Sequence, residues 1–153
     1  RRVKTAFGYY TPDKETLFCK QLLRKENEII GYETGLSALN RIGLVSQMPK
    51  RRCIATNLHT KRIPEGMQIE IRKPPIVVNS GNFRYLQILD AIRELDMAPV
   101  DTAKPIDVVR ATVEEFTLKT EMLILMARKY YGQKTLLRTI DILLEGSYET
   151  ARG

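Results

Sequence analysis

Residues 31–56, GYETGLSALNRIGLVSQMPKRRCIAT, contain the pattern that decides the expected fold. Thr34 precedes small and apolar residues that predict a short helix through Asn40, and its hydroxyl can cap the first turn. Gly43 then provides the left-handed stop that often follows a helix. Residues 53–56 are apolar or β-branched and predict a buried strand. The stretch therefore predicts a tight helix-to-strand unit, and nothing in it is typical of a catalytic apparatus.

The residues before this stretch predict a strand or strand pair and then a helix. Residues 3–10, VKTAFGYY, are rich in β-branched and aromatic side chains, and Gly8 permits a bend. Thr11 and Pro12 are expected to open the helix, because threonine supplies a cap oxygen and proline fits the first helical position. We expect this helix to end near Asn27.

The residues after the stretch predict further strands. Apolar and polar side chains alternate in residues 67–72, which is typical of a half-buried strand in an antiparallel meander. Residues 60–63 and 76–78 are candidate strands on either side of it. The sheet is therefore expected to be small and mostly antiparallel.

From residue 79 onward, apolar residues at helical spacing predict helices to the end of the chain. The apolar face expected for the last helix comprises Leu136, Leu137, Ile140, Leu143 and Leu144. Gly146 is expected to end this helix and to leave residues 147–153 as a frayed tail. Because strands and helices are segregated along the chain, the pattern predicts an α+β fold with a four-helix C-terminal bundle.

Composition allows a soluble globular protein with an anionic partner. The 153 residues include 25 Lys and Arg against 18 Asp and Glu, a formal net charge of +7. Such an excess favours nucleic acid or acidic surfaces, although it can also serve solubility alone. No apolar run approaches the roughly 20 residues of a membrane span, so no membrane association is expected. Cys19, Cys53 and a single histidine make a metal site improbable and indicate buried thiols in a reducing cytoplasm.

Two groups of cations are candidate contacts for nucleic acid or for an acidic partner. The first group comprises Lys50, Arg51, Arg52, Lys61 and Arg62. The second group comprises Arg1, Arg2 and Lys4. If residues 60–63 form a neighbouring strand, the first group makes a continuous basic edge of the sheet. Such an edge could bind the phosphates of a nucleic acid without distinguishing its base sequence. The alternatives are a solvated charged face and a disordered basic terminus.

No residue pattern points to catalysis. His59 has no accompanying nucleophile or carboxylate motif, and Glu114 and Glu115 are adjacent on an expected helix, where neighbours do not face each other. No phosphate-binding glycine loop is present in the sequence, and no cofactor is expected. The aspartates at 90, 96, 101 and 107 lack diagnostic spacing. A metal-dependent enzyme of nucleic-acid metabolism therefore remains a rival hypothesis without a motif.

The segments on which these expectations rest also resemble a known family. The matching residues are Gly8, Tyr9, Tyr10 and Pro12, then Gly35, Ser37, Ala38, Leu39, Asn40, Gly43, Leu44, Gln47, Pro49 and Thr56. In the antitoxin family of AbiE-type (type IV) toxin–antitoxin systems, a small-residue helix reading ALN..GL leads through a Gln-x-Pro turn into a strand ending in Thr. The chain resembles this family with most of the N-terminal winged helix missing.

The resemblance implies a non-enzymatic antitoxin that neutralises a nucleotidyltransferase-like toxin and, when full length, represses its own operon by binding operator DNA. It also implies an organisation in four parts. These parts are a wing remnant at 1–10, a mixed α/β subdomain at 11–78, a helical subdomain at 79–146 and a tail at 147–153. A stand-alone DNA-binding or scaffolding domain without a toxin is the plainer alternative.

Overall fold

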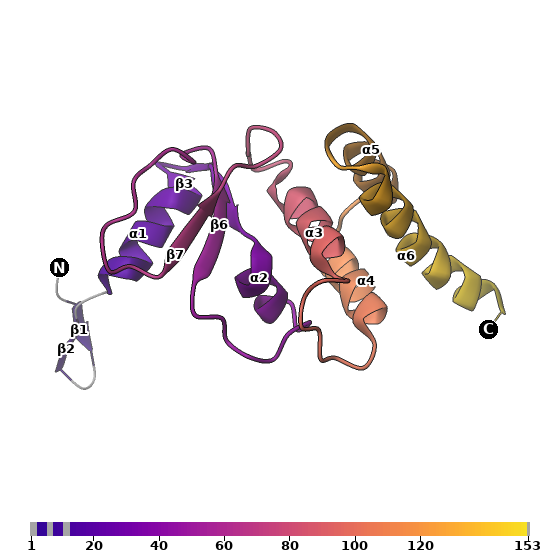
Figure 1. Ribbon diagram of the computed structural model, residues 1–153, viewed down its shortest axis with the longest axis horizontal. Coiled ribbons are helices and arrows are strands. Elements are labelled where there is room, and N and C mark those ends of the chain that lie inside the picture. Colours follow the sequence, from indigo (N-terminus) through magenta and orange to yellow (C-terminus); the bar gives the residue numbers. More distant parts are fainter. Residues whose placement is uncertain (1–2, 6–7, 11–12, 153) are drawn as a thin grey trace.

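The computed structural model describes residues 3–5, 8–10 and 13–152, with side chains described for residues 13–145 (Figure 1). The described elements are β1 (Val3–Thr5), β2 (Gly8–Tyr10), α1 (Lys14–Leu23), β3 (Arg24–Lys25), β4 (Glu28–Ile29), β5 (Gly31–Glu33), α2 (Gly35–Arg41), β6 (Arg52–Thr56), β7 (Ile69–Arg72), α3 (Phe83–Glu94), α4 (Pro105–Glu115), α5 (Thr120–Tyr130) and α6 (Gln133–Arg152). The described part of the chain thus combines six helices with small sheets of two or three strands.

The N-terminal strand pair is confirmed. β1 and β2 form an antiparallel two-stranded sheet in which Thr5 pairs with Gly8 and Lys4 pairs with Tyr9. The start of α1 differs from the expectation, because Asp13 is the N-cap residue and its carboxylate accepts a hydrogen bond from the Glu15 backbone N–H at 3.3 Å. Thr11 and Pro12, the expected start, lie outside the described residues. The helix ends at Leu23 rather than near Asn27, because the chain turns there into the β3–β4 hairpin.

The three-stranded sheet has the order β5–β6–β7 and mixes two kinds of pairing. β5 is antiparallel to β6, with Tyr32 opposite Ala55. β7 is parallel to β6, with Ile54 opposite Ile71, so the predicted antiparallel meander is wrong at this pair. A parallel pair needs a crossover connection, and residues 57–68 provide it by running back along α1 before β7 begins.

The two other candidate strands do not form. Residues 57–60 are a turn, and 61–64 have no regular structure. Residues 76–78 are not a strand, and the Asn57 side chain pairs with the backbone of Val78 instead. The Asn57 amide donates to the Val78 carbonyl oxygen at 3.0 Å, and its oxygen accepts from the Val78 N–H at 2.8 Å. Here one asparagine satisfies the backbone groups that a neighbouring strand would otherwise pair.

Helices cover both faces of the sheet. α1 packs on one face, where Leu22, Ile54 and Ile69 belong to the smaller of two apolar clusters. α2 and α3 lie on the other face, and α5 and α6 lie on the far side of α3 (Figure 1). The larger cluster runs from the sheet through α2 and α3 to α5 and α6, and it includes Tyr32 of β5 and Leu86 of α3. One core therefore crosses the expected subdomain boundary between residues 78 and 79.

The helix stop at Gly43 is confirmed. Gly43 has φ +92°, and the Leu44 N–H returns to the Leu39 carbonyl oxygen at 2.9 Å. The Asn40 amide donates to the Val45 carbonyl oxygen at 3.0 Å and thereby fixes the chain beyond the stop. This local pattern explains how a short helix is closed before β6 begins.

Two expectations for the last helix are wrong, namely its end at Gly146 and the residues on its buried face. α6 continues through Gly146 to Arg152, so the glycine does not end it. Its buried face carries Thr135, Thr139 and Ile142, whereas Leu137 and Leu144 are 52 % and 59 % exposed. Threonine can occupy the core side because its hydroxyl bonds back along the helix, as Thr139 does to the Thr135 carbonyl oxygen at 2.8 Å. None of the described helices is long and apolar enough to cross a membrane.

Candidate functional site

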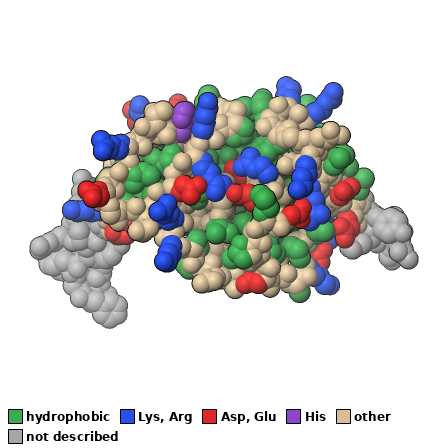
Figure 2. All heavy atoms as spheres, in the orientation of Figure 1, with side chains coloured by type: hydrophobic (Ala, Val, Ile, Leu, Met, Phe, Trp, Pro, Cys, Tyr) green, Lys and Arg blue, Asp and Glu red, His purple; other side chains and the backbone are tan. Residues whose placement is uncertain are grey.

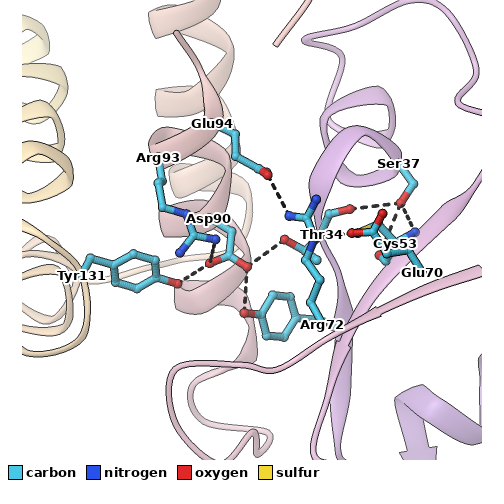
Figure 3. Close-up of polar contacts among 10 residues, drawn as sticks. Thr34, Ser37, Cys53, Glu70, Arg72, Asp90, Arg93, Glu94 and Tyr131 are labelled. Carbon is cyan, nitrogen blue, oxygen red and sulfur yellow. Dashed lines mark hydrogen bonds and ion pairs between the residues drawn. The ribbon is translucent and has the colours of Figure 1, made fainter. Parts of the chain in front are cut away.

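Asp90 of α3 is the centre of a buried polar network that joins four parts of the fold (Figure 3). Its Oδ2 accepts hydrogen bonds from the Tyr32 hydroxyl at 2.9 Å and from the Thr34 hydroxyl at 2.7 Å. Its Oδ1 accepts a hydrogen bond from the Tyr131 hydroxyl and lies 3.4 Å from a guanidinium nitrogen of Arg93. Both carboxylate oxygens are therefore occupied by donors from β5, the start of α2, α3 and the residue after α5.

Burial governs the electrostatics of this network. It raises the pKa of Asp90 above the ordinary value for aspartic acid, although Tyr131, Arg93 and the other donors act in the opposite direction. Burial and the nearby carboxylate also raise the pKa values of Tyr32 and Tyr131. Both tyrosines therefore stay protonated and remain donors. An enclosed carboxylate with every partner in place is suited to holding elements together rather than to proton transfer.

Thr34 does not have the role that the sequence predicts for it. It is the N-cap residue of α2, but its hydroxyl makes no capping hydrogen bond and donates to Asp90 instead. The sequence does contain a signal for the network, because Asp90 interrupts the apolar run Ile88, Leu89, Ala91 and Ile92 on α3. A carboxylate in such a run needs a buried partner. The partners come from distant segments, so the pattern on α3 does not identify them.

A second polar cluster lies at the edge of the sheet beside α2 (Figure 3). The Arg72 guanidinium donates to Glu70 Oε2 at 2.8 Å and to Glu94 Oε1 at 2.7 Å. Hydrogen bonding by Arg72 lowers the pKa of Glu70, which also lies 3.5 Å from the Cys53 thiol. Burial raises the pKa of Cys53 to about 12, so this thiol is not a nucleophile at neutral pH.

Among the predicted contact residues whose side chains are described, Arg52 forms an ion pair with a carboxylate. Its guanidinium donates to Glu33 Oε1 at 2.8 Å, and Arg41 binds the same oxygen at 2.8 Å. The Glu33 side chain is 7 % exposed, whereas that of Arg52 is 28 % exposed. Arg52 therefore contributes to the fold at the start of β6 and offers less of its charge to a partner than expected.

The other predicted cations do not form a single strand edge. Lys50 and Arg51 are exposed or partly exposed ahead of β6, and Arg62 is exposed in the connection to β7. Lys61 lies against α1, with its ammonium 3.2 Å from Gln21 Oε1 and 5.1 Å from the centre of the Phe18 ring. Of the second group, Lys4 belongs to β1, and the first two residues lie outside the described part of the chain.

Surface charge on the face shown in Figure 2 is mixed. Lys and Arg side chains are spread over it and interleaved with Asp and Glu rather than gathered into one patch. The positive excess of the whole chain is therefore not concentrated on this face. Any contact with an anion here must depend on local groups of cations.

The four aspartates of the rival enzyme hypothesis each have different partners. Asp90 belongs to the buried network, Asp96 lies 3.1 Å from Arg138, Asp101 accepts from the Ser46 N–H at 3.0 Å, and Asp107 pairs with Arg110. Within the described residues, no three His, Cys, Asp or Glu side chains form a group that could hold a metal ion. His59 is exposed in the turn after β6 and lines a shallow pocket with Lys73 and Pro74.

The helices α5 and α6 present apolar side chains to solvent, among them Leu137 and Leu144, which the sequence pattern placed on the apolar face of the last helix. Leu137 and Leu144 are seven positions apart on α6 and therefore share one face. On α5, Met122 and Leu125 are 40 % and 43 % exposed. These four residues are called the α5–α6 apolar surface below.

Comparisons with known proteins assign no family or fold. No family model, no curated protein and no solved structure matches this chain.

Proposed function

We propose that this protein is a non-enzymatic, antitoxin-like regulator that neutralises a nucleotidyltransferase-like toxin in the cytoplasm by binding it through the α5–α6 apolar surface. The observation that carries the proposal is the exposure of Leu137 and Leu144, at 52 % and 59 %, on a helix whose core side uses threonine. Leucines at a surface and threonines in the core reverse the usual preference of both residues. A partner that covers α6 removes this conflict.

The charges around these leucines are mixed, and the net charge of the chain favours a protein partner with an acidic surface. Lys134 lies one turn before Leu137 on α6, and Lys129 is exposed near the end of α5. Asp141, one turn after Leu137, and Glu145, next to Leu144, are exposed acidic neighbours on the same helix. With a net charge of +7 for the chain, long-range attraction selects an anionic partner, and the apolar contacts then hold it. The second copy of this chain that a homodimer requires would carry the same positive charge.

The buried acids support a binding role over an enzymatic one. Asp90 has donors on both oxygens, and Glu33 shares one oxygen between two arginines. Asp90 is enclosed, and Glu33 lines a pocket whose described lining contains arginines but no serine, threonine or cysteine. A protein of this kind acts through its surfaces.

Operator binding is the second half of the proposed function and requires the complete winged helix. The β1–β2 hairpin fits the end of a wing, and Lys4 lies on its first strand. Lys50, Arg51 and Arg62 supply further cations for phosphate contacts.

In this proposal the fold is of the α+β class, and α3 to α6 act as one C-terminal four-helix bundle.

The experiment is a binding measurement between the full-length protein and a nucleotidyltransferase encoded by a gene of the same operon. The double variant Leu137→Ser and Leu144→Ser should weaken the complex at least about tenfold, because burial of a leucine contributes about 1.5–3 kcal/mol. The matched control is Leu36→Ser on α2, a leucine that is 43 % exposed and distant in sequence from the surface. Calorimetry gives the affinity, and circular dichroism checks that each variant is folded. Equal affinity of the double variant and the control contradicts the proposal.

A further inference from the structure

A pocket of about 230 Å³ opens where the β3–β4 hairpin and β5 meet the first turns of α3. Three arginines from three different elements line it: Arg24 of β3, Arg41 of α2 and Arg84 of α3. The carboxylate in the lining is Glu33, and the aromatic ring of Phe83 forms part of the wall. The pocket is thus a concave, cationic site assembled from segments that are far apart in the sequence.

Among the described residues, aromatic rings and an amide, rather than an ion pair, hold Arg84 in place. Its guanidinium stacks on the rings of Phe116 and Phe83, with distances of 4.0 and 4.8 Å to the ring centres. One terminal nitrogen donates to Gln87 Oε1 at 3.0 Å, and the Gln87 amide is itself anchored to the Glu33 carbonyl oxygen at 3.0 Å. Burial lowers the pKa of Arg84, and Glu115 is the carboxylate that opposes this effect through its charge. A desolvated, oriented guanidinium with donors to spare is prepared for an anion.

Glu33 does not neutralise the pocket. Its Oε1 is shared by Arg41, through Nε, and by Arg52. One carboxylate thus faces two guanidinium groups directly, and Arg24 and Arg84 add two further positive charges around it. The fork of terminal nitrogens on Arg41, whose side chain is 62 % exposed, remains for a ligand.

We propose that this pocket binds a phosphate group, either free or at the end of a small phosphorylated molecule. Guanidinium groups match phosphate oxygens by paired hydrogen bonds, and their approach from several elements suits a tetrahedral anion with oxygens in several directions. The volume is below the roughly 300–1,000 Å³ of pockets that enclose whole drug-sized ligands, so it accommodates a single phosphate group rather than a nucleotide. The site is separate from the α5–α6 apolar surface and extends the function beyond toxin binding.

The test measures inorganic phosphate binding by calorimetry at constant ionic strength, with sodium chloride as the exchanged salt. The full chain should bind phosphate saturably, and Arg84→Gln should weaken binding about tenfold or more, as expected for loss of a charge-assisted hydrogen bond. Arg62→Gln is the matched control, because it removes the same charge from an exposed position outside the pocket and should leave affinity within about twofold. Absence of saturable binding, or equal losses in the two variants, overturns the proposal.

Two further measurements make the test independent of variant folding and identify the source of the phosphate. Backbone amide shifts of the unmodified protein should move on phosphate addition at residues 41, 84 and 87 and stay in place around residue 62; uniform or absent shifts count against the site. Phenyl phosphate should compete with inorganic phosphate, whereas a short DNA duplex should not. If only the duplex competes, the ligand of the pocket is the phosphate backbone of a nucleic acid rather than a small phosphorylated molecule, and the proposal is rejected. Toxin affinity should be unchanged in Arg84→Gln, which separates this result from the test of the proposed function.

Discussion

The Thr34 hydroxyl donates a hydrogen bond to Asp90 Oδ2 at 2.7 Å, across 56 positions of sequence. This contact joins the start of α2 to the middle of α3, and Tyr131 extends the connection to the end of α5. Hydrogen bonds to one buried carboxylate thereby connect the sheet to the helices that follow it. Its removal is the most direct test of how the two halves are held together.

Asp90→Ala should destabilise the protein by about 3–5 kcal/mol, because it leaves Tyr32, Thr34 and Tyr131 as buried donors without an acceptor. Tyr131→Phe should cost only about 1–2 kcal/mol, since it removes one donor and leaves the carboxylate with other partners. Urea unfolding followed by circular dichroism measures both values. If Asp90→Ala costs no more than Tyr131→Phe, the carboxylate is not the centre of the network.

The raised pKa of Asp90 predicts a specific pH dependence of stability. The folded state holds the Asp90 proton more tightly than the unfolded state, so this contribution is fully present below the ordinary aspartate pKa of about 4 and is lost as pH rises through the folded value. Asp90→Asn cannot titrate at this position. The free energy of unfolding of the wild type, minus that of the variant, should therefore fall as pH increases from about 4. A difference that increases with pH would show that the donors outweigh burial.

Gly31→Ala should destabilise the protein by about 1–3 kcal/mol or more, the usual cost of overpacking a core. A Cβ at Gly31 would lie 2.4 Å from the Leu22 carbonyl oxygen and 2.9 Å from that of Ala55, both backbone atoms that cannot move away easily. Gly132→Ala is the control, because a Cβ there meets no atom within 4 Å. Thermal unfolding should leave the control within about 0.5 kcal/mol of the wild type. Similar losses in both variants would contradict the close approach of α1 to β5.

Arg51 and Arg52 are adjacent in sequence, but we expect them to respond differently to mutation. Arg52→Ala leaves the nearly buried Glu33 with one fewer partner and should cost about 1–3 kcal/mol. Arg51→Ala removes an exposed charge and should change the free energy of unfolding by less than about 0.5 kcal/mol.

In the full-length protein, Arg51→Glu with Arg62→Glu should weaken operator binding and reduce the dependence of the affinity on salt concentration. Unchanged affinity across a salt titration would reject the DNA contact, whatever the stability of the variants.

Both cysteines should resist modification in the native state. Cys19 and Cys53 are buried, and burial raises the pKa of each thiol. A thiol-specific reagent at pH 8 should therefore react only as fast as the protein opens, and denaturant should accelerate the reaction. Rapid labelling of one equivalent without denaturant would show that one of these thiols is accessible.

Local features were the part of the structure that the sequence predicted well. The N-terminal strand pair, the glycine stop at Gly43, the strand over 53–56 and the burial of both cysteines all follow from neighbouring residues and are confirmed. The candidate site was harder to predict. Arg52 has the same sequence context as its basic neighbours, and only the position of Glu33 on β5 makes it a structural cation.

Pairings between distant segments explain the remaining errors. The direction of β7 depends on the path of residues 57–68 over α1, and the apolar pattern of β7 is the same in a parallel or an antiparallel pair. On α6, two adjacent faces are both compatible with burial, and the packing against α3 and α5 placed Thr139 inward and left Leu144 exposed.

The sequence by itself determined the β1–β2 pair, the helix stop at Gly43 and the strand β6, because glycine stops and apolar or β-branched runs act between residues a few positions apart. Only the tertiary structure decided the partners of the polar groups. Thr34 caps a helix in its sequence context, yet burial against α3 makes the Asp90 carboxylate its partner. A buried carboxylate needs hydrogen-bond donors, and tertiary packing supplies them from segments that are distant in the sequence.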